Sequence, residues 1–173
     1  MTRYTRNAVS QAAARLLKAA GVTRPPVPLR EIVSVLNLSL VESQREPFSS
    51  EAALVPSGEG LAIKVSAGSE RRRRFTIAHE IGHYVLHESG PRYERGGSVN
   101  EAARRREREA DTFAAELLMP EHMVRHAVLE EGADARRLAD RFEVSVQAMS
   151  IRLRRLGLAE RQSDLLPPSR EAL

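Results

Sequence analysis

Cysteine is absent from the 173 residues, which excludes disulfides and thiolate metal sites. Any bound metal would therefore use His and carboxylate ligands. Aromatic residues are scarce, at 4%, so aliphatic side chains must fill the core. Hydrophobic residues make up 42%, which suffices for one compact domain. No apolar run approaches the roughly 18 residues that a membrane-spanning helix needs. Composition therefore predicts a compact domain without a membrane span.

Lysine is also rare, since Lys18 and Lys64 are the only two and every other cation is Arg. The net charge of +4 and the pI of about 10.1 are compatible with nucleic acid or an acidic partner. Arg and Ala richness together is typical of a GC-rich genome, however, and the high pKa of Arg raises the pI. Direct nucleic-acid binding is thus possible but is not the favoured interpretation. The N-terminus leads into a polar, Ala-rich helix and not a signal peptide, so we expect a cytoplasmic protein.

Hydrophobic periodicity and turn residues predict the order of the elements. Helices are expected over residues 7–20, 29–36, 69–87, 101–118, 120–131, 134–141 and 146–156. Short strands are expected over residues 38–41, 53–55 and 61–65. This order predicts a mainly helical α+β fold with a small antiparallel sheet and C-terminal helices of helix-turn-helix character. We divide the chain into a main domain (1–131), a helical segment packed on it (132–159) and a flexible tail (160–173), and we expect 88–100 to be a mobile loop.

The run His79-Glu80-Ile81-Gly82-His83 is an H-E-x-x-H motif inside a predicted helix. Helical spacing places His79 and His83 one turn apart on one face, where both rings reach one ion. Glu80 is rotated by roughly 100° from His79. It therefore flanks the metal without binding it, and it is placed to take a proton from the attacking water and pass it to a leaving amine. A helix with two structural histidines is the alternative.

A zinc site needs a third protein ligand and an open fourth position. His87 continues the four-residue spacing, but on a straight helix it rises about 12 Å above His79, too far for a shared ion. His122 and His126 form another four-residue pair, with no neighbouring carboxylate that clearly completes a site. We interpret these two as ordinary surface or core histidines.

Glu107 is the better third ligand. On a helical wheel it shares the predicted inward stripe with Asp111, whereas Glu109 points roughly 200° away. A buried carboxylate is costly without a partner, and a zinc ion would supply one. Asp111 is placed to accept a hydrogen bond from a ligand His. The alternative is that Glu107 pairs with a nearby Arg. Gly82, between the two histidines, lets the second helix approach closely.

Two segments resemble the signature of the ImmA/IrrE family of metallo-endopeptidases. They are residues 74–87 (RFTIAHEIGHYVLH) and residues 107–120 (EREADTFAAELLMP), and weaker similarity extends the resemblance over roughly residues 7–158. It implies a gluzincin-like site that holds one zinc ion per chain through His79, His83 and Glu107, with Glu80 catalytic. The family often has Asn where this chain has Asp111.

The resemblance also implies a substrate. Proteins of this family cleave helix-turn-helix transcriptional repressors of the Xre type, often encoded nearby, and so derepress target genes. We also expect residues 61–65 to form an edge strand that binds substrate, because its apolar alternation and its short link to the motif helix suit that role. The residues concerned are Leu61, Ala62, Ile63, Lys64 and Val65. An interior strand is the alternative.

Two further functions compete with proteolysis. Residues 138–153 have helix-turn-helix character, and Arg152, Arg154 and Arg155 could meet phosphates, as in a DNA-binding regulator. We favour helices that pack on the catalytic domain or grip its substrate. A metal sensor without catalysis is the other alternative, and the intact Glu80 argues against it. Residues 71–74 are four successive arginines, which we expect to stay solvated or to attract acidic substrate segments.

Overall fold

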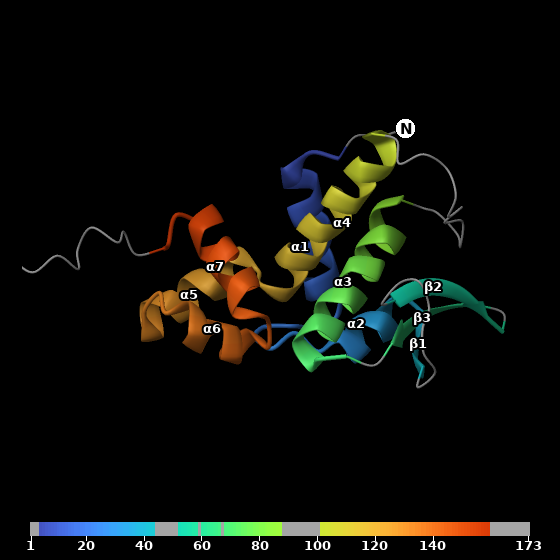
Figure 1. Cartoon of the computed structure of the whole chain (residues 1–173), viewed down its shortest axis with the longest axis horizontal. Helices are drawn as coiled ribbons and strands as arrows, with labels where there is room; N and C mark the ends of the chain where they lie inside the picture. The colour runs from blue at the N-terminus through green and yellow to red at the C-terminus, as the bar shows by residue number, and fades with distance from the viewer. Residues whose placement is uncertain (1–3, 44–51, 59, 67, 88–100, 160–173) are drawn as a thin grey trace, which may run out of the picture.

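Two long helices form the centre of the computed structural model, which describes residues 4–43, 52–58, 60–66, 68–87 and 101–159. They are α3 (Glu70–His87) and α4 (Glu101–Leu118), and they pack along each other. The helix α1 (Arg6–Ala19) lies against α4 (Figure 1). These bounds confirm the predicted helices to within one residue. None of the helices in this part of the chain is both long and apolar enough to cross a membrane. The predicted loop 88–100 and tail 160–173 lie outside the described residues.

Gly82 allows α3 and α4 to approach this closely. A Cβ atom at this position would lie 3.1 Å from both the Cα and the carbonyl oxygen of Ala110, and 3.2 Å from the Cβ of Phe113. Such distances are shorter than ordinary packing contacts, and Ala110 presents backbone, which cannot rotate away. The prediction that the missing side chain admits the second helix is confirmed.

We expect Gly82→Ala to lower the free energy of unfolding by about 1–2 kcal/mol. Overpacking costs about 1–3 kcal/mol, and the higher helix propensity of Ala offsets part of it. Urea denaturation measures the change. Gly68→Ala is the matched control, because a Cβ there has no atom within 4 Å and its backbone is unstrained. Equal stability of both variants would contradict the close approach.

The three strands form one small sheet in the order β1–β3–β2. They are β1 (Ser39–Ser43), β2 (Ala52–Ser57) and β3 (Gly60–Ser66), and β3 pairs parallel with β1 and antiparallel with β2. The sheet is therefore mixed, and the expected antiparallel sheet is wrong in this respect. A parallel pair needs a long connection, and β2 with the hairpin turn lies between β1 and β3 in the chain.

The prediction that residues 61–65 form an edge strand is wrong. Ile63 pairs with Leu40 on one side and with Leu54 on the other, so β3 has no free edge for a substrate. Ala62, Ile63 and Val65 are also buried. The alternation of side chains along residues 61–65 shows which face of the strand is apolar. It does not show which strands pair with it, and that pairing decides whether the strand is at an edge.

Three shorter helices form the C-terminal part of the described chain, and Figure 1 shows them gathered to one side of α4. They are α5 (Glu121–Glu131), α6 (Ala135–Phe142) and α7 (Val146–Arg155). Asp134 and Ser145 cap the starts of α6 and α7 through their side chains. Glu143 adopts a left-handed conformation (φ 52°), which makes the tight turn between them. Two short helices joined by such a turn have the helix-turn-helix character that was predicted.

Buried and half-buried charges attach this pair of helices to α3 and α4. The guanidinium of Arg152, with 2% of its side chain exposed, donates two hydrogen bonds of 2.6 Å to the Glu116 carboxylate and one of 2.9 Å to the Met119 carbonyl. Arg152 is therefore not available to meet phosphates, which removes it from the DNA-binding alternative and agrees with the favoured interpretation that these helices pack on the rest of the chain.

The arginine run at the start of α3 makes further contacts with the same helices. Arg71 pairs with Asp140, and Arg74 lies 3.3 Å from Glu143 and donates to the Val27 carbonyl at 2.8 Å. Burial lowers the pKa of Arg74, against the opposing charges of Glu143 and Glu70. Arg74 is thus part of the packing, and the expectation that the run stays solvated or attracts substrate is wrong for this residue, whereas 41% of the Arg71 side chain is exposed.

Candidate metal centre

The structure brings together the two histidines of α3 and a carboxylate of α4. The Nε2 atoms of His79 and His83 lie 2.9 Å apart. The Glu107 carboxylate oxygens lie 3.3 Å from Nε2 of His79 and 3.5 Å from Nε2 of His83. Groups of at least three His, Asp or Glu side chains could share an ion if their donor atoms lay close together. Within the described part of the chain, His79, His83 and Glu107 form the one such group.

The spacing of these donor atoms fits a tetrahedral ion. Zinc–nitrogen and zinc–oxygen distances near 2 Å place neighbouring ligand atoms about 3.3 Å apart in a tetrahedron. The two Nε2 atoms are 2.9 Å apart, Oε2 of Glu107 is 3.3 Å from His79 and Oε1 of Glu107 is 3.5 Å from His83, so each ring has one carboxylate oxygen at about that spacing. Two imidazoles and one carboxylate without thiolates also form a donor set that zinc accepts. The residues therefore fit a zinc ion with one open position.

Asp111 fixes the orientation of the first histidine. Nδ1 of His79 donates a hydrogen bond of 2.9 Å to the Asp111 carboxylate, because that group only accepts at neutral pH. In the neutral ring this donation leaves the lone pair on Nε2 of His79, the atom that faces His83 and Glu107. Asp111 contacts the ring of His79 and is not itself one of the three donors. This agrees with the expected position of Asp111.

The electrostatics of the two histidines differ. Burial acts to lower the pKa of His79, but the hydrogen bond to Asp111 and the charges of Asp111, Glu80 and Glu107 outweigh it and raise that pKa. Burial and the neighbouring charge of His79 lower the pKa of His83 to about 4. His83 is therefore unprotonated at neutral pH and offers a lone pair.

The helical wheel of α4 was only partly right. The buried stripe contains Ala110, Phe113, Ala114, Leu117 and Leu118. Glu107 and Asp111 lie at the edge of this stripe, with 45% and 58% of their side chains exposed. The premise of a fully buried Glu107 is therefore wrong, and its half-exposed place suits the rim of an open site. The buried stripe includes Phe113, which the wheel placed on the opposite side, and both Ala110 and Phe113 lie against Gly82 of α3.

The other histidines and carboxylates considered in the sequence analysis lie outside this group of three donors. His87 was rejected as a ligand, and its Nε2 faces the Arg106 carbonyl at 3.4 Å and the Glu109 carboxylate at 3.8 Å. Glu109 was expected to point outward, yet only 12% of its side chain is exposed. His126 has 70% of its side chain exposed and lies beside Glu130 on α5. The interpretation of His126 as a surface histidine agrees with this placement.

We expect Glu107→Gln to lose the bound metal and Glu109→Gln to keep it. The amide is a weaker ligand than the carboxylate, and only Glu107 has oxygens near both histidines. Elemental analysis of the purified proteins after dialysis against limiting zinc measures the metal content. The two substitutions are on the same helix and change the same charge, so they are matched. Loss of metal from Glu109→Gln alone would contradict the assignment.

A family model confirms the resemblance noted in the sequence. The peptidase family M78, described as the IrrE N-terminal-like domain, matches residues 34–154, which include both motif helices. The chain therefore belongs to the IrrE N-terminal-like peptidase family. Its members form a metallopeptidase family, and the His79, His83 and Glu107 group is a possible metal site in that setting.

A solved structure has a similar fold. It is described as a Mycobacterium tuberculosis transcriptional regulator, with a TM-score of 0.62 and 18% sequence identity. The match covers 87% of this chain and 47% of that protein, so the chain spans about half of its length. At this identity the likeness concerns the fold alone. No curated protein matches the chain significantly.

Proposed function

We propose that the chain is a zinc-dependent endopeptidase that hydrolyses a peptide bond in a helix-turn-helix transcriptional repressor of the Xre type and so derepresses its target genes. The observation that carries the proposal is the group of His79, His83 and Glu107 around one point, with the donor spacing of a tetrahedral ion. Membership of a metallopeptidase family supports it. One zinc ion per chain and a cytoplasmic location belong to the same proposal.

The roles of the residues follow from their places. His79, His83 and Glu107 hold the ion, and Asp111 orients the ring of His79. Zinc, when bound, supplies Lewis acidity that lowers the pKa of water and polarises a carbonyl oxygen. Glu80 accepts the proton of the attacking water and gives it to the departing amine nitrogen. The half-exposed rim at Glu107 leaves room for a peptide to reach the centre.

The contacts of α6 and α7 bear on the choice between a protease and a DNA-binding regulator. Ion pairs of Arg152, Arg71 and Arg74 join these helices or the turn between them to α3 and α4. We propose that residues 132–159 pack on the metallopeptidase domain of residues 1–131 as part of the protease, with 160–173 as a tail. Arg154 and Arg155 are exposed, so a gel shift with duplex DNA at two salt concentrations tests the alternative.

The repressor encoded beside this chain is the substrate to test. The full-length, zinc-loaded protein is incubated with the purified repressor, and the products are analysed by gel electrophoresis and mass spectrometry. We expect one defined cut, which a chelator prevents and added zinc restores. His83→Ala should abolish it with loss of metal. An intact repressor after prolonged incubation with the metal-loaded protein would contradict this substrate.

A further inference from the structure

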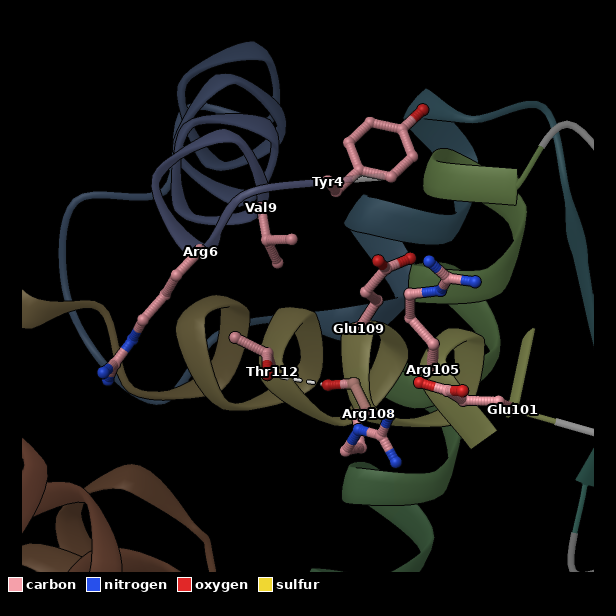
Figure 2. A pocket seen from close by; sticks show the side chains of 8 residues that line it. All are labelled: Tyr4, Arg6, Val9, Glu101, Arg105, Arg108, Glu109 and Thr112. Carbon is pink, nitrogen blue, oxygen red and sulfur yellow. Dashed lines mark hydrogen bonds between the residues drawn. The ribbon is translucent and has the colours of Figure 1, made fainter. Parts of the chain in front are cut away.

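A cleft of about 350 Å³ lies between the start of α1 and the first half of α4. Tyr4 and Arg6 line it from the N-terminal side, and Arg105, Arg108 and Glu109 line it from α4 (Figure 2). Helical spacing places Arg105 and Glu109 on the side turned away from Glu107, and it rotates Arg108 by about 100° from that residue. The cleft is thus distinct from the metal centre, and its volume is in the range of ligand-binding pockets.

Three arginines of this cleft carry unneutralised charge. Neither Arg6, nor Arg105, nor Arg108 has an ion pair or a side-chain hydrogen bond with any other residue that the structure describes. Five arginines elsewhere pair with carboxylates, namely Arg71, Arg74, Arg125, Arg141 and Arg152, whereas Arg154 and Arg155 on the open surface of α7 have no ion pair among the described residues. Fixed positive charge in a recess attracts negative groups, because a low-dielectric wall concentrates the field. The cleft therefore favours a ligand with negative charge.

The arrangement of the arginines indicates the shape of that ligand. Figure 2 shows the guanidinium groups of Arg6, Arg105 and Arg108 well apart from one another, and not converging on one point. A compact anion such as phosphate needs convergent donors. Spread charges instead match an extended chain whose negative groups are separated. The ligand is therefore an extended polyanion and not a small anion.

Two carboxylates in the same cleft separate a peptide from a nucleic acid. Glu101 and Glu109 also line it, so its charge is of mixed sign. A nucleic acid carries a phosphate at every step and would be repelled at both positions. A peptide with acidic side chains at intervals meets the arginines and leaves neutral or basic groups opposite the glutamates. Tyr4 adds a ring with a hydroxyl, a side chain common in peptide-binding surfaces.

The side chain of His87 lies between the cleft and the metal centre. The ring of Tyr4 lies edge-on to the ring of His87, with centroids 6.2 Å apart, and the His87 ring lies 5.5 Å from that of His83. Glu109 approaches His87 from the same cleft. A polypeptide bound here would therefore be held within a short chain length of the candidate catalytic site.

We propose that this cleft is an exosite that binds an acidic segment of the protein substrate. The substrate part of this inference rests on the proposed function, whereas peptide binding to the cleft does not. Arg6, Arg105 and Arg108 pair with the acidic side chains of the segment, and the bound segment raises the local concentration of the scissile bond at the metal centre.

The test measures binding without cleavage. The full-length, zinc-loaded protein with Glu80→Gln is titrated into a fluorescein-labelled dodecapeptide of alternating Glu and Ser, and anisotropy is recorded. The matched peptide has Gln in place of Glu. We expect the acidic peptide to bind more tightly and to lose affinity as salt increases. Arg105→Gln with Arg108→Gln should weaken binding about tenfold, since each charge pair is of modest strength at a partly exposed site.

Arg154→Gln with Arg155→Gln is the control pair, because it removes two exposed arginines from α7. It should change the affinity less than twofold. Equal binding of the Gln peptide, or an equal loss in the control pair, would overturn the exosite. Tighter binding of single-stranded DNA than of the acidic peptide, lost in the cleft variant, would also overturn it in favour of nucleic acid. None of these outcomes affects whether the wild type cuts the repressor, so the two proposals are tested separately.

Discussion

Glu80→Gln is expected to stop proteolysis while the protein keeps its fold and its metal. Loss of a general acid–base group lowers rates by roughly 10²–10⁴-fold. Glu80 is adjacent to His79 on α3 but is outside the donor group of His79, His83 and Glu107, so its amide should leave metal binding unchanged. The measurements are kcat for repressor cleavage and zinc content by elemental analysis, on the same preparation.

The control for this prediction is Glu80→Asp, which keeps the carboxylate but shortens its reach. We expect its activity to lie between those of the wild type and Glu80→Gln, because proton transfer requires hydrogen-bond distance. If Glu80→Gln cleaved at the wild-type rate, Glu80 would not be the base. If it lost zinc, its effect would concern the structure of the site and not proton transfer.

Arg152→Met is expected to lower the free energy of unfolding by about 3–5 kcal/mol, because it leaves a nearly buried charge without its partner. The Glu116 side chain is only 11% exposed, and both of its oxygens accept hydrogen bonds from Arg152. The Met119 carbonyl also loses its donor. Chemical denaturation followed by circular dichroism measures the free energy of unfolding. A loss well below the expected range would show that the ion pair contributes little to stability.

The double variant Arg152→Met with Glu116→Leu separates the two causes of this loss. Replacing both members of a buried ion pair by apolar groups leaves no unpaired charge, so it should be less destabilising than Arg152→Met alone. Arg154→Met is the surface control, since Arg154 is exposed on the same helix, and it should change stability by less than about 0.5 kcal/mol. A double variant as unstable as the single one would indicate lost packing in place of an unpaired charge.

The sequence by itself determined the helices and the two histidines of the candidate metal centre. The helices at 70–87 and 101–118 were predicted to within one residue, because long amphipathic runs with clear ends reflect local energetics. The i, i+4 spacing of His79 and His83 is a property of one helix, so it required no tertiary information. Glu107 was chosen from helical phase and family resemblance, and the structure places it beside both rings.

Sequence reasoning failed wherever the outcome depended on which elements are neighbours. The role of β3 as the central strand depends on β1, whose Ser39 pairs with Ala62 of β3, far along the chain. The burial of Glu109 depends on contacts outside its own helix, such as the one with His87 of α3. The pairing of Arg71, Arg74 and Arg152 depends on where α6 and α7 dock.

The local sequence therefore determined the helices, their ends, and two donors at a fixed spacing. Only the tertiary structure decided the strand order, the partners of the arginines and the meeting of Glu107 with the histidines. The physical reason is that helix periodicity and capping arise from interactions within a few residues. Strand neighbours, ion pairs and burial arise from contacts between segments far apart in the chain, such as Gly82 against Ala110, which no periodicity encodes.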